Sequence, residues 1–180
     1  KLSDAKEIIL SHSNISVVAS SAIYTAIEEL EKKDVLNNRS SIKLKLLTSF
    51  NAEEEAEIKD ELDKVTDQGF TTIKVKVGKD VNLDLKKINY IQSNLNGRAK
   101  IRIDANRGYT EKEGCKFVVG LQPDNIELFE QPCDANNWKA NAAVAELSRI
   151  PIMLDEPICS INDIKKASKI EGVGLCKLKL

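Results

Sequence analysis

The chain has almost no net charge, a single histidine and no long apolar run. Its 27 lysines and arginines nearly balance 28 aspartates and glutamates over 180 residues, so it has no basic footprint of the kind that binds nucleic acid. The apolar runs span only a few residues, far short of a membrane span, and the first residues lack the apolar segment of a secretory signal. We therefore expect a cytoplasmic protein whose partners include neither nucleic acid nor a membrane.

Motifs for redox, zinc and dinucleotide chemistry are also missing. The cysteines (Cys115, Cys133, Cys159 and Cys176) are widely spaced, with no Cys-x-x-Cys pair, so we expect reduced thiols. His12 lies in a helical segment and is expected to be a surface residue rather than a ligand. No G-x-G-x-x-G follows the first predicted strand and no P-loop is present, which argues against a dinucleotide site.

Strands and helices alternate from residue 42 onward. Strands are predicted over 42–49, 71–77, 100–105, 126–130, 151–155 and 174–180, and helices over 52–67, 81–95, 110–120, 135–148 and 160–170. Asn51 and Asp134 are expected helix caps, and Thr110 with Glu113 is expected to form a capping box. This strict rotation predicts an α/β fold with a parallel sheet, which could be an open doubly wound sheet or part of a barrel.

Charged residues recur at the predicted strand ends. Lys76, Asp104, Glu130, Asp155 and Lys179 follow one another at intervals of about 25 residues, the length of a strand, a helix and two short loops. The carboxyl ends of parallel strands form the rim where α/β and barrel proteins place their sites. Each β/α unit is therefore expected to deliver one charged side chain to the same place.

The residue types suggest a metal between two bases. Carboxylates from three neighbouring strands can converge on one cation, and an all-oxygen set suits Mg²⁺ better than zinc. Lysine pairs flank these acids: Lys74 shares a strand face with Lys76, and Lys177 shares one with Lys179. A network of buried salt bridges is the purely structural alternative.

Barrel geometry would place these residues so that they could carry out a proton-transfer reaction. In an eight-stranded barrel the second and sixth strands are opposite, so Lys76 and Lys179 would face one substrate carbon from two sides. A cation next to the substrate carboxylate would stabilise the enediolate formed when the α-proton leaves, and would lower the lysine pKa values toward neutrality. Removing a proton from one face and returning it on the other predicts racemisation or epimerisation.

The order and spacing of these motifs resemble the enolase superfamily, specifically the muconate lactonizing enzyme subgroup of the mandelate racemase/muconate lactonizing enzyme family. The resemblance covers roughly residues 15 to 180 and rests on Lys74-Val75-Lys76-Val77-Gly78, Asp104-Ala105-Asn106, Glu130-Gln131-Pro132, Asp155-Glu156 and Leu178-Lys179-Leu180. Arg107 departs from the pattern, because many subgroup members carry glutamine there. The lysine on the sixth strand favours the lysine–lysine subgroup.

This resemblance implies a (β/α)₈ TIM-type barrel, of which residues 41–180 would form about the first six strands. Residues 1–38, including a helix over Ser20–Lys33, would be the helical end of a separate capping domain. Because the sequence stops on a strand, we expect it to be part of a longer protein. A homo-oligomer that acts on a small-molecule carboxylate is also expected.

The resemblance further assigns roles to individual residues. It implies that Asp104, Glu130 and Asp155 ligate one Mg²⁺. Lys76 and Lys179 would be the acid/base pair, and Lys74 would hold the substrate carboxylate. Two further residues, Asn106 and Glu156, would orient the metal ligands.

Four activities are compatible with these residues. The first is a racemase, epimerase or cycloisomerase acting on a dipeptide or a muconate-like acid. The second is a dehydratase of the succinylbenzoate synthase type, which would use the same residues. The third is a Schiff-base aldolase that uses Lys179 as its nucleophile, and the fourth is an inactive barrel homologue.

Overall fold

The computed structural model describes residues 1–31 and 43–179. The chain divides into a helical unit, which contains α1 (Leu2–Ser11) and α2 (Val17–Glu31), and a barrel unit, Lys45–Leu178. Lys179 is grouped with the helical unit. The predicted domain boundary at residues 38–41 lies outside the described residues, so the division into 1–38 and 41–180 stays a prediction.

The barrel unit is built on a sheet of six parallel strands in sequential order. They are β1 (Thr48–Phe50), β2 (Thr72–Lys76), β3 (Lys100–Asp104), β4 (Ile126–Glu130), β5 (Ile152–Leu154) and β6 (Val173–Cys176). In a doubly wound sheet the strand order reverses at a switch point, whereas barrel strands follow one another around the axis. The observed order confirms the α/β fold and decides for the barrel-type arrangement.

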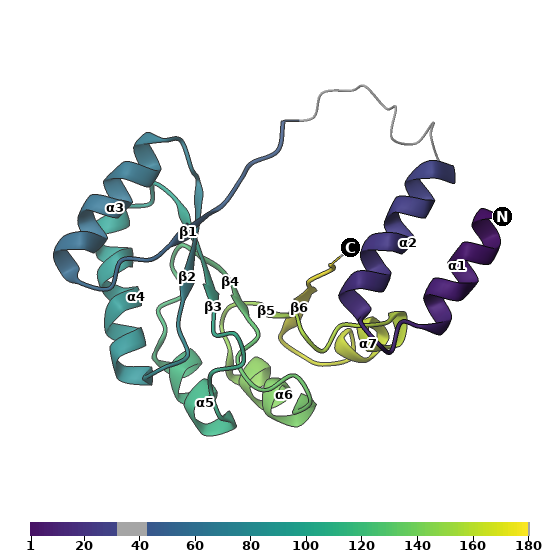
Figure 1. Ribbon diagram of the computed structural model, residues 1–180. Coiled ribbons are helices and arrows are strands. Elements are labelled where there is room, and N and C mark those ends of the chain that lie inside the picture. The colour runs from purple at the N-terminus through teal and green to yellow at the C-terminus, as the bar shows by residue number, and fades with distance from the viewer. Residues whose placement is uncertain (32–42, 180) are drawn as a thin grey trace. The chain divides into compact units, whose positions relative to one another are not determined.

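Helices cover one side of this sheet. They are α3 (Glu55–Asp67), α4 (Val81–Leu95), α5 (Glu111–Gly120), α6 (Trp138–Leu147) and α7 (Ile161–Ala167). Figure 1 shows α3 to α6 following one another around the outside of the strands. Ile73, Val75, Ile101 and Ile103 are fully inaccessible beneath these helices. Because side chains alternate along a strand, Lys74 is directed to the opposite face, where the barrel interior would be.

Two strand predictions were wrong at one end. The first strand begins at Thr48 rather than at residue 42, which is itself outside the described residues. Residues 43–46 alternate lysine and leucine like a strand, but Leu44 and Leu46 are exposed, so the alternation buries no apolar face. The last strand ends at Cys176 rather than at residue 180, and the lysines that follow it therefore lie beyond the regular strand.

Helix starts were the other source of error. The third helix begins at Glu55 rather than at residue 52, and its N-cap residue is Glu54 rather than Asn51. The N–H groups of Asn51 and Ala52 donate to the Glu61 carboxylate. The sixth is capped by Asn137 rather than by Asp134. Helix α4 and strand β4 have the predicted bounds, and the capping box of Thr110 and Glu113 is confirmed.

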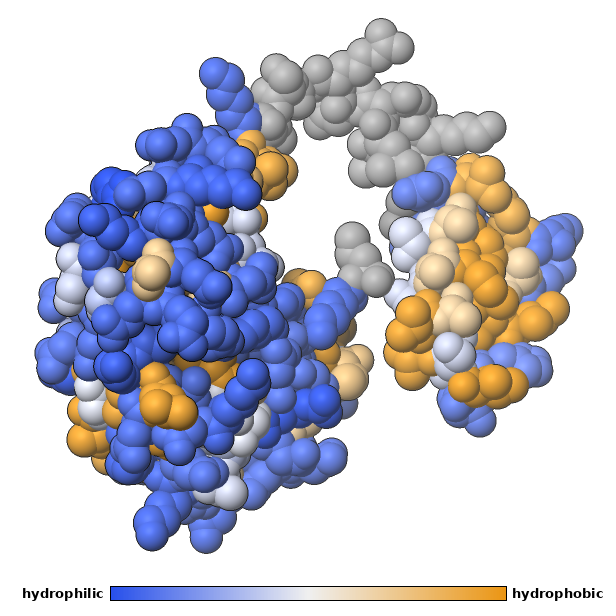
Figure 2. Space-filling view, turned by 60° about the vertical axis from the view of Figure 1, so that its left-hand side comes forward, coloured by the Kyte–Doolittle hydropathy of each residue, from blue (hydrophilic) through white to orange (hydrophobic). Residues whose placement is uncertain are grey.

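The helical unit has little buried core. Lys6 on α1 pairs with Glu31 on α2 at 2.5 Å and lies over the Tyr24 ring. Many of its large apolar side chains are exposed, namely Leu2, Ile8, Leu10, Ile15, Val17, Val18, Ile23 and Leu30. Figure 2 shows this unit largely in orange, whereas polar residues cover most of the visible face of the barrel unit. Over the described residues, no helix has both the length and the apolar character needed to cross a membrane.

Two glycines offer a matched test of the barrel packing. Gly172 and Gly69 both have positive φ, 81° and 85°. A Cβ at Gly172 would lie 2.1 Å from the Ala145 carbonyl oxygen on α6, whereas a Cβ at Gly69 would meet nothing within 4 Å. Gly69→Ala should cost about 1–2 kcal/mol for the left-handed backbone, and Gly172→Ala distinctly more because α6 must also move. Equal losses of unfolding free energy in the two variants, measured by urea unfolding, would contradict the close approach of α6 to Gly172, which directly precedes β6.

Candidate active site at the strand ends

Three acidic side chains meet at the carboxyl edge of the sheet. Asp104 ends β3, Glu130 ends β4, and Asp155 directly follows β5. Asp104 and Glu130 are partners in the strand register, so they lie side by side. Their relative exposures are 1% for Asp104, 2% for Glu130 and 5% for Asp155. Such burial is costly for carboxylates unless cations compensate them.

Lysines provide that compensation. The Lys74 ammonium lies 2.7 Å from Asp104 Oδ2 and 2.6 Å from Glu130 Oε2, so it bridges two strands. Lys76 lies 2.6 Å from Asp104 Oδ2. We call the following six residues the strand-end cluster: Lys74, Lys76, Asp104, Glu130, Asp155 and Lys177.

Lys177 contributes from the position directly after β6. Its ammonium lies 2.7 Å from Glu130 Oε1 and 3.7 Å from Asp155 Oδ2. Its backbone N–H donates to the Leu154 carbonyl at 2.8 Å, so the β5–β6 pairing fixes its place. The sequence pattern favours Lys179 for this position. Lys179 is grouped with the helical unit, and its catalytic role stays a prediction.

The charges of the cluster stabilise one another. Burial by itself lowers the pKa of Lys74, but hydrogen bonds to Asp104 and Glu130 outweigh it and hold the pKa above its ordinary value. Burial raises the pKa of Asp104, but hydrogen bonds from Lys74, from Lys76 and from the Asn106 N–H lower it below its usual range. Lys74 is therefore an ammonium group and Asp104 a carboxylate at neutral pH.

The two predicted orienting residues, Asn106 and Glu156, lie on the loops after β3 and β5. Asn106 donates its backbone N–H to Asp104 Oδ1 at 2.8 Å, and its side-chain oxygen accepts a hydrogen bond from Lys76. Arg107 Nε lies 3.4 Å from Glu156 Oε1. The other oxygen of Glu156 is buried and has no hydrogen-bond partner among the described residues. The roles of Asn106 and Glu156 in orienting metal ligands stay predictions.

Gln131 is a site residue that the sequence reasoning missed. It is completely buried, has a φ of 39°, and follows Glu130 directly. Its Oε1 accepts the backbone N–H of Asp155 at 2.9 Å, and its Nε2 donates to the Cys133 carbonyl at 2.9 Å. This amide therefore connects the ends of β4 and β5. The Glu-Gln-Pro motif could have indicated a role for Gln131, but its side chain is not ionisable and so was not among the predicted site residues.

The donor set of the cluster is compatible with a hard cation. In their present arrangement, the described side chains include no group of three histidines, cysteines, aspartates or glutamates that could hold a metal. The ammonium groups of Lys74 and Lys177 lie between the carboxylates instead. Three buried carboxylates on adjacent strand ends, already balanced by positive charge, nevertheless fit Mg²⁺ in ligand type. Ligation by Asp104, Glu130 and Asp155 stays a prediction.

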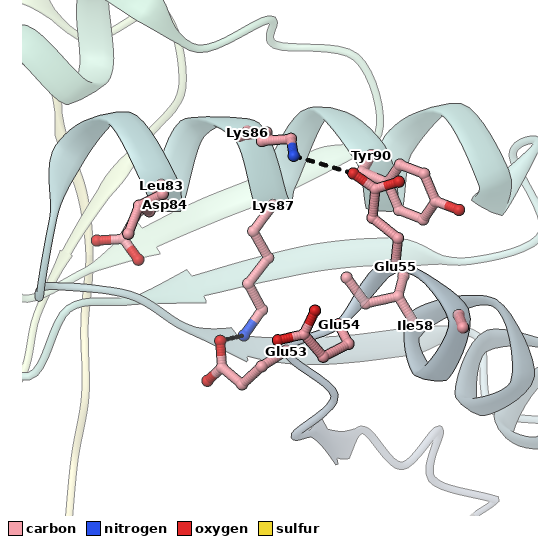
Figure 3. A pocket seen from close by; sticks show the side chains of 10 residues that line it. Glu53, Glu54, Glu55, Ile58, Leu83, Asp84, Lys86, Lys87 and Tyr90 are labelled. Atoms are coloured by element: carbon pink, nitrogen blue, oxygen red, sulfur yellow. Dashed lines mark ion pairs between the residues drawn. The ribbon is translucent and has the colours of Figure 1, made fainter.

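Other candidate groups lie outside the cluster. A hollow of about 560 Å³ between α3 and α4 is lined by Glu53, Lys87 and eight further residues, none of them from the cluster (Figure 3). The four cysteines are free, as expected. Burial raises the pKa of the Cys133 thiol to about 12, so it is no thiolate nucleophile near neutrality.

Similar sequences come from epimerases. An L-Ala-D/L-Glu epimerase of Clostridium acetobutylicum is 32% identical over 144 residues, which are 79% of this chain and 40% of that protein. A D-Ala-D/L-Ala epimerase of Cytophaga hutchinsonii is 33% identical over 117 residues, which are 65% of this chain and 32% of that protein. The chain thus spans two fifths or less of the length of these two relatives.

Solved structures show the same fold. A dipeptide epimerase from Enterococcus faecalis V583 superposes with a TM-score of 0.65 and 26% identity, over 72% of this chain and 38% of that one. The muconate lactonizing enzyme from Pseudomonas putida has a TM-score of 0.76 and 23% identity, over 87% of this chain and 46% of that one.

A family model described as "Enolase C-terminal domain-like" matches residues 57–180, which carry the entire strand-end cluster. The chain therefore belongs to the enolase C-terminal domain-like family, within the enolase (mandelate racemase/muconate lactonizing enzyme) superfamily.

Proposed function

We propose that this protein is a Mg²⁺-dependent isomerase that removes the proton α to a carboxylate and epimerises a small acid, with a dipeptide as the best candidate. The strand-end cluster carries this proposal, because it gathers three buried carboxylates and three lysines at one sheet edge. The names of the relatives that are more than 30% identical support epimerisation of dipeptides. We also propose, from the sequence alone, a homo-oligomer in the cytoplasm.

Lys76 is placed to act on the substrate carbon. Its ammonium is half exposed, whereas its partner Asp104 is almost completely buried. A lysine beside a rim can exchange protons with a bound molecule while its carboxylate partner remains fixed in the protein. As the neutral amine it would take the α-proton, and the electron pair of the broken C–H bond would move into the carboxylate to give an enediolate.

Lys74 suits a binding role better than a proton-transfer role. It is held by two carboxylates, and their hydrogen bonds keep its pKa raised, so it stays an ammonium group. An ammonium group at this place can pair with the carboxylate of the substrate. When bound by Asp104, Glu130 and Asp155, Mg²⁺ would supply further positive charge where the enediolate develops.

Two lysines, Lys177 and Lys179, are candidates for the second base. The reaction needs an ammonium on the other face to return the proton, and strand β6 is the source that the barrel geometry suggests. Spacing favours Lys179, whereas the observed ion pairs bring Lys177 to Glu130 and Asp155. We propose Lys177 for this role and retain Lys179 as its rival.

Single lysine variants will separate these roles. L-Ala-L-Glu and L-Ala-D-Glu are incubated separately with the enzyme and Mg²⁺ in D₂O, and α-proton exchange is followed by NMR. Lys76→Ala and Lys177→Ala should each lower epimerisation by about 10²–10⁴-fold, the usual value of one acid/base group. Exchange from a single epimer should survive in each variant, because one base remains.

Two control variants complete this experiment. Lys100→Ala removes an exposed lysine at the opposite end of β3 and should leave turnover unchanged. Lys179→Ala should also be active if Lys177 is the second base. Loss of activity in Lys179→Ala with full activity in Lys177→Ala would reverse this assignment, and full activity in Lys76→Ala would refute the two-base mechanism.

Metal dependence can be tested with and without turnover. Treatment with EDTA should abolish exchange and added Mg²⁺ should restore it. Without substrate, Mg²⁺ at a hundred times its Kd should raise the free energy of unfolding by about 2.7 kcal/mol. Asp104→Asn should lose this stabilisation, whereas Asp63→Asn, which removes a surface partner of Arg98, should keep it. An unchanged response in Asp104→Asn would argue against the predicted ligands.

A further inference from the structure

Asp84 is a buried acid that none of the steps above uses. It lies in the first turn of α4 and is 8% exposed. Its Oδ2 accepts the backbone N–H groups of Gly78, Lys79 and Asp80 at 3.0, 3.1 and 3.2 Å. It also accepts the Tyr109 hydroxyl at 2.6 Å. Figure 3 shows the Asp84 carboxylate apart from the ion pairs of Lys86 and Lys87.

The three amides belong to the loop that directly follows Lys76. Lys76 is the last residue of β2, and Gly78 stands two residues later with a φ of 108°. At this point the loop meets the loop after β3 backbone to backbone. A Cβ at Gly78 would lie 2.6 Å from the Ala105 carbonyl oxygen, and one at Gly108 would lie 2.4 Å from the Gly78 carbonyl oxygen. The two loops can approach so closely only because glycine occupies both positions.

Tyr109 ties the second loop to the same carboxylate. It is almost fully buried, and its ring packs against Phe117 at 5.2 Å and Phe129 at 6.4 Å between centroids. Burial, together with its hydrogen bond to Asp84, raises the pKa of Tyr109 far above its ordinary value, so its hydroxyl remains a donor. Asp84 thus holds both the loop that follows Lys76 and the loop that carries Asn106. The Lys76 ammonium donates a hydrogen bond to the Asn106 side chain.

Capping of α4 does not account for Asp84. The N-terminus of this helix is already capped by Asp80, whose Oδ1 accepts the N–H groups of Asn82 and Leu83. All three amides bound by Asp84 instead lie before the helix begins. The carboxylate therefore organises the loop and not the helix.

We propose that Asp84 is a positioning residue for the Lys76 side of the site, acting through the loop Gly78–Asp80 and through Tyr109. This inference rests on the proposed function in one respect, namely that Lys76 transfers a proton. A displacement of about 1 Å in a reacting group can cost 10²-fold in rate, so holding this loop has a catalytic consequence. Asp84 itself does not touch the substrate.

Asp84→Asn is the main test, because the amide keeps the shape but removes the negative charge that strengthens the hydrogen bonds from the three loop N–H groups and from Tyr109. The exchange of each dipeptide epimer in D₂O is measured separately. Exchange from the epimer served by Lys76 should fall at least 10-fold more than exchange from the other epimer, and kcat should fall more than KM rises. Tyr109→Phe, which removes one of the four donors and leaves the Asp84 carboxylate charged, should shift the same ratio about threefold.

The control is Ile91→Val, a fully buried residue of the same helix. It should lower the melting temperature without changing the ratio of the two exchange rates. In the double variant Asp84→Asn/Tyr109→Phe, the effect of the tyrosine change should largely vanish, because its partner is already altered. Equal losses on both faces in Asp84→Asn, matching those of Ile91→Val, would overturn the positioning role.

A measurement without substrate keeps this inference separate from the proposed function. Amide hydrogen exchange at Gly78, Lys79 and Asp80 should be slow in the wild type, at least 10-fold faster in Asp84→Asn and unchanged in Ile91→Val. Exchange that is equally fast in wild type and Asp84→Asn would refute the loop contact. If the loop amides behave as expected but the wild type epimerises no dipeptide, the substrate assignment fails while the role of Asp84 in the loop stands.

Discussion

Both the fold and the candidate site depend on the compensation of buried charge at one edge of the sheet. Asp104 and Glu130 are almost inaccessible to water, and a lone carboxylate in that position would be neutralised or would destabilise the fold. Lys74 prevents this by bridging both acids, and it reaches them only because β2, β3 and β4 are parallel and in register. A shift of one residue in β2 would turn Lys74 toward the helices and Ile73 toward the acids. The register of the strands therefore determines whether the charges of the site are compensated.

The sequence predicts most of this arrangement, because buried charges and their compensating partners can be recognised from the residue types and their spacing. Apolar alternation located β2 and β4, and the Thr110–Glu113 pair located the start of α5. Acids at regular spacing predicted the site edge. The pattern failed where packing decides, as at Leu44 and Leu46, whose alternation continues although no partner among residues 1–31 and 43–179 covers them.

The choice between Lys177 and Lys179 is one that the alternation of the sequence cannot make. Both residues occupy the same face of an alternating segment, so parity cannot distinguish them. In the structure, hydrogen bonding to β5 extends as far as the Lys177 N–H, which donates to the Leu154 carbonyl.

From β2 to β5, each strand end in the site is joined to its neighbour by a group that has no proposed part in the chemistry. Asp84 and Tyr109 join the loops after β2 and β3, the Arg107 N–H donates to the Gln131 carbonyl between β3 and β4, and the Gln131 side chain accepts the Asp155 N–H between β4 and β5. Positive φ values at Asn106, Arg107 and Gln131 are costly for residues with a side chain, and they occur within this series of contacts. Hydrogen bonds that continue from loop to loop offset this cost jointly. The groups that we propose to react can therefore be arranged before substrate arrives, which is what the proposed proton transfer between two faces of one carbon requires.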